Sequence, residues 1–137
     1  MKSRGHALIS LAVAAAVWIV APPASLLVLL VVVVGIGVGI DFDHFLVARL
    51  NTGSWRGVRR CLRNPAVIFL DQDEIFEEDA LTRIQRLFSH TLIGGVVVGV
   101  AAVISVYWAT VVAITVYTHV VADLFDDVRH QFDADPS

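Results

Sequence analysis

The sequence contains few charged residues and a single cysteine. Only 17% of its 137 residues are charged, whereas 57% are hydrophobic, and the mean hydropathy is +0.75. This balance lies outside the range of soluble domains of similar length. Because Cys61 is the only cysteine, an intramolecular disulfide is excluded and a reducing compartment is compatible with the chain. We therefore expect one all-α membrane domain covering residues 1–137.

Two long apolar segments lack charged residues. The first covers residues 7–40 and is interrupted at 21–24, and the second covers residues 91–122. As one helix the second segment would be about 48 Å long, against a hydrocarbon thickness of about 30 Å. Each segment is therefore expected to form a hairpin. The sequence predicts a bundle of four transmembrane helices at about 7–21, 24–40, 90–106 and 108–123. A loop of about 45–88, with an amphipathic and an acidic part, connects helices two and three.

The basic residues are confined to one side of this topology. All ten lie near the termini or in the long loop, and neither predicted turn, at Pro22-Pro23 or near Ser105, carries a charge. By the positive-inside tendency, both termini and the loop are cytoplasmic and the chain is a multi-pass protein of the cell membrane. Lys2 and Arg4 before an apolar run also fit a cleaved signal peptide, which is an alternative for the start of the chain.

Histidines and aspartates lie at the cytoplasmic ends of all four predicted helices. They are His6, Asp41, Asp43, His44, His90, His119 and Asp123. Spacings of three and four residues place Asp41 with His44, and His119 with Asp123, on common helix faces. An ionisable residue within a membrane costs about 2.5 to 3.5 kcal/mol, which a bound cation would offset. We expect one or more divalent transition-metal ions, with zinc first and manganese or iron as alternatives.

These seven candidates exceed the four ligands of a tetrahedral zinc ion. Either several ions bind, or some of the residues orient ligands or act as a general base. Asp43 is the candidate for a bridging ligand or the general base, and Arg86 for stabilising developing negative charge. The pattern favours the hypothesis of a multinuclear hydrolytic centre, in which the ions would hold a phosphoryl or carbonyl oxygen of the substrate. We expect a phosphoester or lipid-derived substrate. An ion transporter is disfavoured, because the far halves of the helices lack polar residues.

The same residues resemble the LexA-binding, inner-membrane-associated hydrolases, a family of small membrane-bound metal-dependent enzymes. The matching motifs are Gly5-His6, Asp41-Phe42-Asp43-His44, Arg86-Leu87-Phe88-Ser89-His90-Thr91, and His119 with Asp123. Their order agrees over most of the chain, with the long loop unmatched. Ile40, Leu87 and Gln85 stand where the family has Pro, Gly and His. The resemblance implies a metal-dependent hydrolase, while Gln85 leaves open a non-enzymatic scaffold or regulatory protein with a structural or vestigial metal site.

Two further patterns concern the loop and the glycines. The loop contains arginines spaced as on one face of a helix, at Arg56, Arg59, Arg60 and Arg63. This spacing predicts a basic helix lying on the membrane near anionic lipid headgroups, and no motif indicates nucleic-acid binding. Acidic residues between positions 71 and 79 predict a solvated turn.

The pairs Gly35 with Gly39 and Gly95 with Gly99 predict a close approach of helices two and three.

Overall fold

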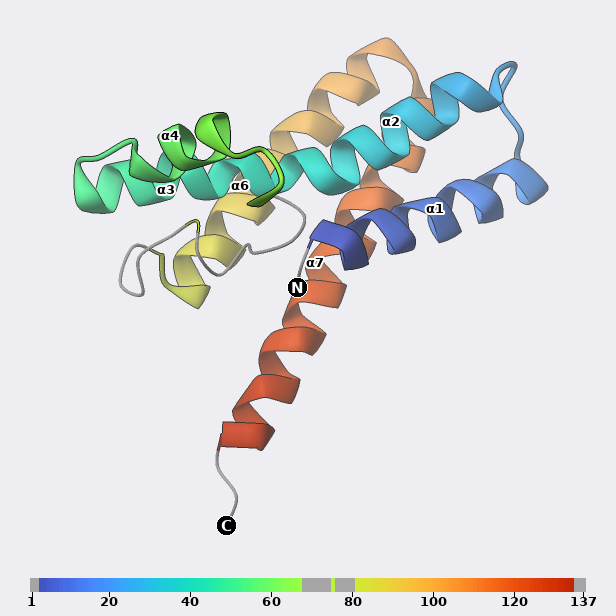
Figure 1. Cartoon of the computed structure of the whole chain (residues 1–137). Helices are drawn as coiled ribbons and strands as arrows, with labels where there is room; N and C mark the ends of the chain where they lie inside the picture. The colour runs from blue at the N-terminus through green and yellow to red at the C-terminus, as the bar shows by residue number, and fades with distance from the viewer. Residues whose placement is uncertain (1–2, 68–74, 76–80, 135–137) are drawn as a thin grey trace.

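The computed structural model describes residues 3–67, 75 and 81–134, and all regular structure within these ranges is helical, as expected (Figure 1). The elements in chain order are α1 (Ser3–Val20), α2 (Leu26–Gly39), the 3₁₀ turn η1 (Ile40–Phe42), α3 (Asp43–Thr52), α4 (Arg56–Arg63), α6 (Arg83–Ile104) and α7 (Val106–Ala134). Figure 1 shows α7 crossing the other helices and extending beyond them toward the C-terminus.

The second predicted helix, at about 24–40, continues without a break into α3. Ile40 and Asp43 keep right-handed helical backbone angles, and the Ile40 N–H donates to the carbonyl of Ile36. A proline at position 40 would lack this donor, so isoleucine allows one rod from Leu26 to Thr52. Gly53, with a φ of 68°, ends the rod in the left-handed conformation. The predicted loop from about 45 therefore begins too early, because helix continues to Thr52.

Three helices are long and apolar enough to cross a membrane. They are Leu26–Thr52, Arg83–Ile104 and Val106–Gln131, and only 22% to 28% of their most apolar windows is buried inside the protein. The remaining apolar surface faces outward, where a bilayer would cover it, so the fold indicates membrane association. The apolar helix Arg4–Val20 is shorter than these three. The described chain thus contains three helices of spanning length, where the sequence predicts four.

Both predicted turns are present, and a hydrogen bond connects them. Ser25 begins α2 and its side chain accepts a hydrogen bond from Val28 N, while Ser105 adopts an extended conformation between α6 and α7. The Tyr107 hydroxyl donates to the carbonyl of Ala21 over 2.8 Å. This bond holds the two hairpins together at the end of the protein that carries no charge. Between the hairpins lies a core of Val13, Ala14, Leu29, Val33 and Val111.

Close packing uses other glycines than those predicted. A Cβ at Gly35, Gly39, Gly95 or Gly99 would meet nothing within 4 Å. A Cβ at Gly37 would overlap Ser10 of α1, and one at Gly94 would lie 2.5 Å from Val116 Cγ1 of α7. The predicted Gly-xxx-Gly contact between helices two and three is therefore wrong. Helix α2 packs on α1 and α7 instead, and α6 packs on α7 and α3.

Candidate metal centre

All seven predicted residues lie together where α1, the α2–α3 rod, α6 and α7 meet. Five are buried and the remaining two, Asp41 and His44, are partly buried. They come from the first turns of α1, the middle of the rod, and the inward faces of α6 and α7. Because α6 and α7 extend outside their apolar segments, to Arg83 and to Ala134, their site residues lie within the helices and not at the helix ends, whereas His6 lies at the start of α1.

A first ligand group consists of His6, Asp41, His119 and Asp123, each offering one ligand atom. The His6 Nε2 atom lies 3.1 Å from Asp123 Oδ1 and 3.8 Å from Asp41 Oδ2. The His119 Nε2 atom lies 3.4 Å from Asp41 Oδ1 and 3.7 Å from Asp123 Oδ2. Ligands of a tetrahedral zinc ion at about 2.0 to 2.1 Å are about 3.4 Å apart, so this spacing suits one ion.

A second ligand group consists of Asp41, His44 and His90. The His90 Nε2 atom lies 3.3 Å from Asp41 Oδ1, and the His44 Nε2 atom lies 4.0 Å from the same oxygen. The His44 and His90 rings stack, with centroids 4.8 Å apart. Asp41 belongs to both groups, which is the position that a bridging carboxylate would take between two ions.

Hydrogen bonds orient two of the histidines toward the centre of the cluster. The Nδ1 atom of His119 lies 2.8 Å from the carbonyl oxygen of Gly37, and the Nδ1 atom of His90 lies 2.7 Å from Asp43 Oδ2. Both partners accept, so each Nδ1 carries a proton, and in the neutral ring each Nε2 presents its lone pair to the cluster. Metal-binding histidines characteristically have such an arrangement, with the second nitrogen donating to a carbonyl or carboxylate.

The Nε2 atoms of three buried histidines face the cluster without a hydrogen-bond partner in the described part of the chain. These residues are His6, His90 and His119. A buried polar atom left without a partner costs about 1 to 3 kcal/mol. The nearest polar atoms to these nitrogens are the oxygens of Asp41 and Asp123, at 3.1 to 3.8 Å. A metal ion between them would be ligated by nitrogens and oxygens together, so the residues present fit a metal site. The buried cluster can hold a metal ion.

Asp43 lies outside both ligand groups. Its Oδ2 accepts from His90, and its Oδ1 is buried 3.7 Å from His44 Nε2. Asp43 therefore positions the second ligand group from behind, while Asp41 takes the shared place between the groups. Sequence spacing predicted Asp41 to share a helix face with His44 and gave Asp43 the role of a bridging ligand or general base, but it is Asp41 that belongs to both ligand groups.

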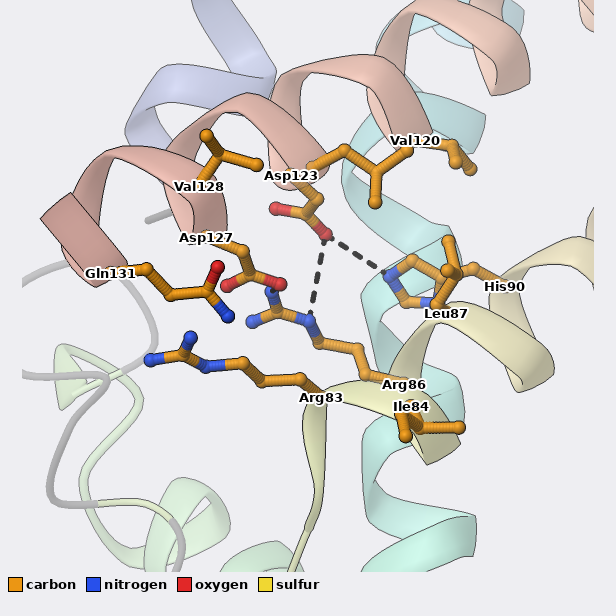
Figure 2. Close-up of a pocket in the computed structure, with 11 residues that line it drawn as sticks. Arg83, Ile84, Arg86, Leu87, His90, Val120, Asp123, Asp127, Val128 and Gln131 are labelled. Atoms are coloured by element: carbon orange, nitrogen blue, oxygen red, sulfur yellow. Dashed lines mark hydrogen bonds and ion pairs between the residues drawn. The ribbon is translucent and has the colours of Figure 1, made fainter.

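Arg86, the other predicted catalytic residue, lies at the edge of the cluster in a pocket between α6 and α7. Its guanidinium lies 2.6 Å from Asp127 Oδ2 and 3.9 Å from Asp123 Oδ2. Figure 2 shows both contacts to α7 and, beside them, the ion pair of His90 with Asp123. Asp127 was not among the predicted site residues, although its spacing of four from Asp123 places both on one helix face.

Gln85 is structural and belongs to neither ligand group. Its side chain accepts from the backbone N–H of Thr82, whose hydroxyl accepts from Gln85 N, which forms a capping box at the start of α6. The same amide exchanges two hydrogen bonds with Asn51 of α3, at 2.8 and 3.2 Å. Gln85 thus joins the rod to α6 just outside the cluster, and both ligand groups are formed without it.

The predicted basic helix is present as α4. Arg56, Arg59, Arg60 and Arg63 are exposed on it, while Cys61 is buried against Phe45, Val67 and Ile75. Burial raises the pKa of the Cys61 thiol. Leu62 remains 77% exposed beside the arginines, so an apolar side chain and basic side chains share the outer surface. The predicted acidic turn at 71–79 lies outside the described residues except for Ile75.

The donor set of the cluster is imidazole and carboxylate, without thiolate, and it suits zinc, manganese or iron better than calcium. Three carboxylates with neutral histidines carry three negative charges. Two divalent cations would leave one positive charge, which a hydroxide or an anionic substrate would balance. Comparisons with protein-family models, with curated proteins and with solved structures found no match to this chain.

Proposed function

We propose that this protein is a membrane-bound, metal-dependent hydrolase with two divalent transition-metal ions, zinc first among them. The observation that carries the proposal is the convergence of the buried Nε2 atoms of His6, His90 and His119 on the carboxylates of Asp41 and Asp123, at 3.1 to 3.8 Å and without a hydrogen bond to them in the described chain. Such a cluster would be strongly destabilising without a cation. The family resemblance, which rests on the same residues, supports hydrolysis as the activity.

The two ligand groups assign different tasks to the residues. His6, His119 and Asp123 would hold one ion, His44 and His90 the other, and Asp41 would bridge them. Ions in such a centre lower the pKa of a bound water to about 7 and polarise a phosphoryl or carbonyl oxygen. Gly37 O and Asp43 keep two imidazoles in the tautomer that can ligate.

Two residues beside the ions complete the proposed chemistry. Asp43 Oδ1 is buried without a hydrogen-bond partner in the described chain, so this carboxylate can accept a proton and act as the general base. The Arg86 guanidinium points into the pocket beside Asp123, where it can stabilise negative charge that develops on a substrate oxygen. Asp127 holds Arg86 in this position through the 2.6 Å contact.

The protein is proposed to lie in the cell membrane with both termini and the α3–α6 connection on the cytoplasmic side. Helix α1 would be the fourth transmembrane helix, because His6 must lie at the same depth as the ligands of the other helices. The exposed arginines of α4, Arg56, Arg59, Arg60 and Arg63, would contact anionic lipid headgroups, each adding about 1 kcal/mol of attraction.

Elemental analysis of the detergent-purified protein tests the metal site. We expect about two ions per chain in the wild type, and loss of metal in the double variant His119→Ala with Asp123→Ala. The matched control is Asp126→Ala with His130→Ala, an aspartate–histidine pair of the same spacing on the same helix, outside both ligand groups, with Asp126 partly buried and His130 exposed. Normal metal content in the first double variant would contradict the proposal, whereas the control should retain both ions.

The alternative is a non-enzymatic membrane scaffold or regulatory protein with a structural metal. Gln85 stands where the resembled family has a histidine, and its side chain forms hydrogen bonds with Thr82 and Asn51 and not with the cluster. The missing histidine therefore favours this alternative. The two functions differ in turnover. A metal-loaded protein that hydrolyses neither p-nitrophenyl phosphate nor p-nitrophenyl acetate would support the scaffold, and metal-dependent hydrolysis of either ester would support the enzyme.

A further inference from the structure

The pocket between α6 and α7 opens directly onto the metal centre. Its volume is about 180 Å³, and its lining includes His90 and Asp123. His90 belongs to the second ligand group and Asp123 to the first. A molecule in the pocket would therefore lie against both proposed ion positions at once.

The pocket has a basic side and an apolar side. Figure 2 shows Arg83 and Arg86 of α6 extending side by side toward Asp127 and Gln131 of α7. Asp127 balances Arg86, and Asp123 belongs to the candidate metal centre. Arg83 is therefore the cation of the lining that forms no ion pair with a carboxylate of the described residues. The apolar side is formed by Ile84, Leu87, Val120, Leu124 and Val128.

The size of the pocket limits what it can enclose. Pockets that bury drug-sized ligands measure about 300 to 1,000 Å³, so a pocket of about 180 Å³ takes only a compact group. Ile84 at the pocket wall is 81% exposed, and further apolar side chains lie outside the lining on the same two helices, with Phe88 68% and Phe125 71% exposed. An attached hydrocarbon chain could leave the pocket along these side chains without entering water.

We propose that the pocket binds the phosphate monoester head of a membrane amphiphile, whose hydrocarbon chain lies outside along α6 and α7. This inference rests on the proposed hydrolase function and names its substrate class. A phosphate monoester has three non-bridging oxygens, enough to face each ion position and Arg83 simultaneously, whereas a carboxylate has only two. In the reaction a water oxygen bonds to phosphorus and the bond from phosphorus to the ester oxygen breaks. The ester oxygen leaves with the electron pair and takes a proton, which yields an alcohol and inorganic phosphate.

The test is a titration of the full chain in lipid nanodiscs with dodecylphosphonate, which cannot be hydrolysed, and separately with inorganic phosphate. Calorimetry measures the affinity, with empty nanodiscs as the blank. We expect dodecylphosphonate to bind about tenfold or more tightly than inorganic phosphate, because a few buried methylene groups suffice for that ratio. Arg83→Gln should weaken dodecylphosphonate binding about tenfold or more through loss of a charge-assisted hydrogen bond. Arg129→Gln, an exposed arginine of α7 outside the pocket, is the control and should bind normally.

Three results would overturn the inference. Equal affinity for both probes would indicate a site for free phosphate. The other two are no dodecylphosphonate binding by metal-loaded protein and equal effects of Arg83→Gln and Arg129→Gln on binding. Metal content and p-nitrophenyl phosphate hydrolysis are measured on the same samples. Metal with hydrolysis but without dodecylphosphonate binding refutes only the substrate class. Dodecylphosphonate binding that depends on Arg83, in protein without metal or hydrolysis, refutes the hydrolase and supports the pocket as an amphiphile site.

Discussion

Replacement of Gly37 by alanine is expected to destabilise the bundle and disturb the metal centre together. Gly37 lies where α2 meets α1 and α7, and its carbonyl accepts from His119 Nδ1. A Cβ at this position would overlap Ser10 Oγ and lie 3.1 Å from Ser10 Cβ and 3.5 Å from Thr115 Cγ2. Rotation of the serine hydroxyl relieves only the first of these contacts. The 3.1 Å contact with Ser10 Cβ remains tight, so we expect α1, which carries Ser10 and His6, to shift by a few tenths of an ångström.

The expected change in the free energy of unfolding follows from two opposing effects. Overpacking of a filled core costs about 1 to 3 kcal/mol, while alanine in place of glycine within a helix contributes about 0.5 to 1 kcal/mol of stability. Gly35→Ala has the same helical contribution but meets nothing within 4 Å. The difference between the two variants isolates the steric cost. For a chain of 137 residues, this steric cost corresponds to a midpoint of thermal unfolding that is about 3 to 10 °C lower for Gly37→Ala than for Gly35→Ala.

Circular dichroism of the detergent-solubilised variants measures these midpoints, and elemental analysis of the same samples measures bound metal. Gly37→Ala should also retain less metal than Gly35→Ala, because the displaced helices carry His6 and His119. Adding Ser10→Gly to Gly37→Ala removes both contacting atoms and should recover stability beyond the sum of the single effects. Identical unfolding midpoints for Gly37→Ala and Gly35→Ala would refute the packing described here.

Three other outcomes follow from the site and its surroundings. Asp43→Ala should weaken metal affinity about 10- to 100-fold, measured by competition with a chelator, because His90 loses its orienting carboxylate; Asp126→Ala, outside both ligand groups, should not. Gln85→Ala removes the capping box and the Asn51 bonds, so the unfolding midpoint should fall by a few degrees with about 1 kcal/mol lost, while metal content stays normal; metal loss would instead make Gln85 part of the centre. Labelling of Cys61 by a thiol reagent should need a higher pH in the folded than in the unfolded protein, because burial raises its pKa and the thiolate is the reacting form.

Much of the site could be read from the sequence, because the residues that carry it are unusual in an apolar chain. Histidines and aspartates beside long apolar runs need compensation, and the turns at Pro22-Pro23 and Ser105 bring them to one side. The structure places all seven candidates together. The same reasoning did not anticipate the continuous helix through Asp41 and His44, since a change from apolar to polar residues resembles a helix end.

Other features depended on the rotation of each helix about its axis, which local sequence does not determine. Gly37 packs while Gly35 and Gly39 face outward, although all three share one glycine-rich stretch. Asp41 is shared by the two ligand groups and Asp43 supports His90 from behind, although only one residue separates them. These assignments follow from the positions of α6 and α7 relative to the rod.

The sequence by itself determined that this is an apolar helical protein with two hairpins, and that its ionisable residues cluster on one side. Hydrophobic run length and the cost of buried charge decide both points locally. Only the tertiary structure decided which nitrogen of His90 and His119 faces the cluster, which aspartate lies between the ligand groups, and that Arg83 and Arg86 share a pocket with two of the ligands. Those features require atoms of three or four helices to lie within a few ångströms of one another, and tertiary packing determines such contacts.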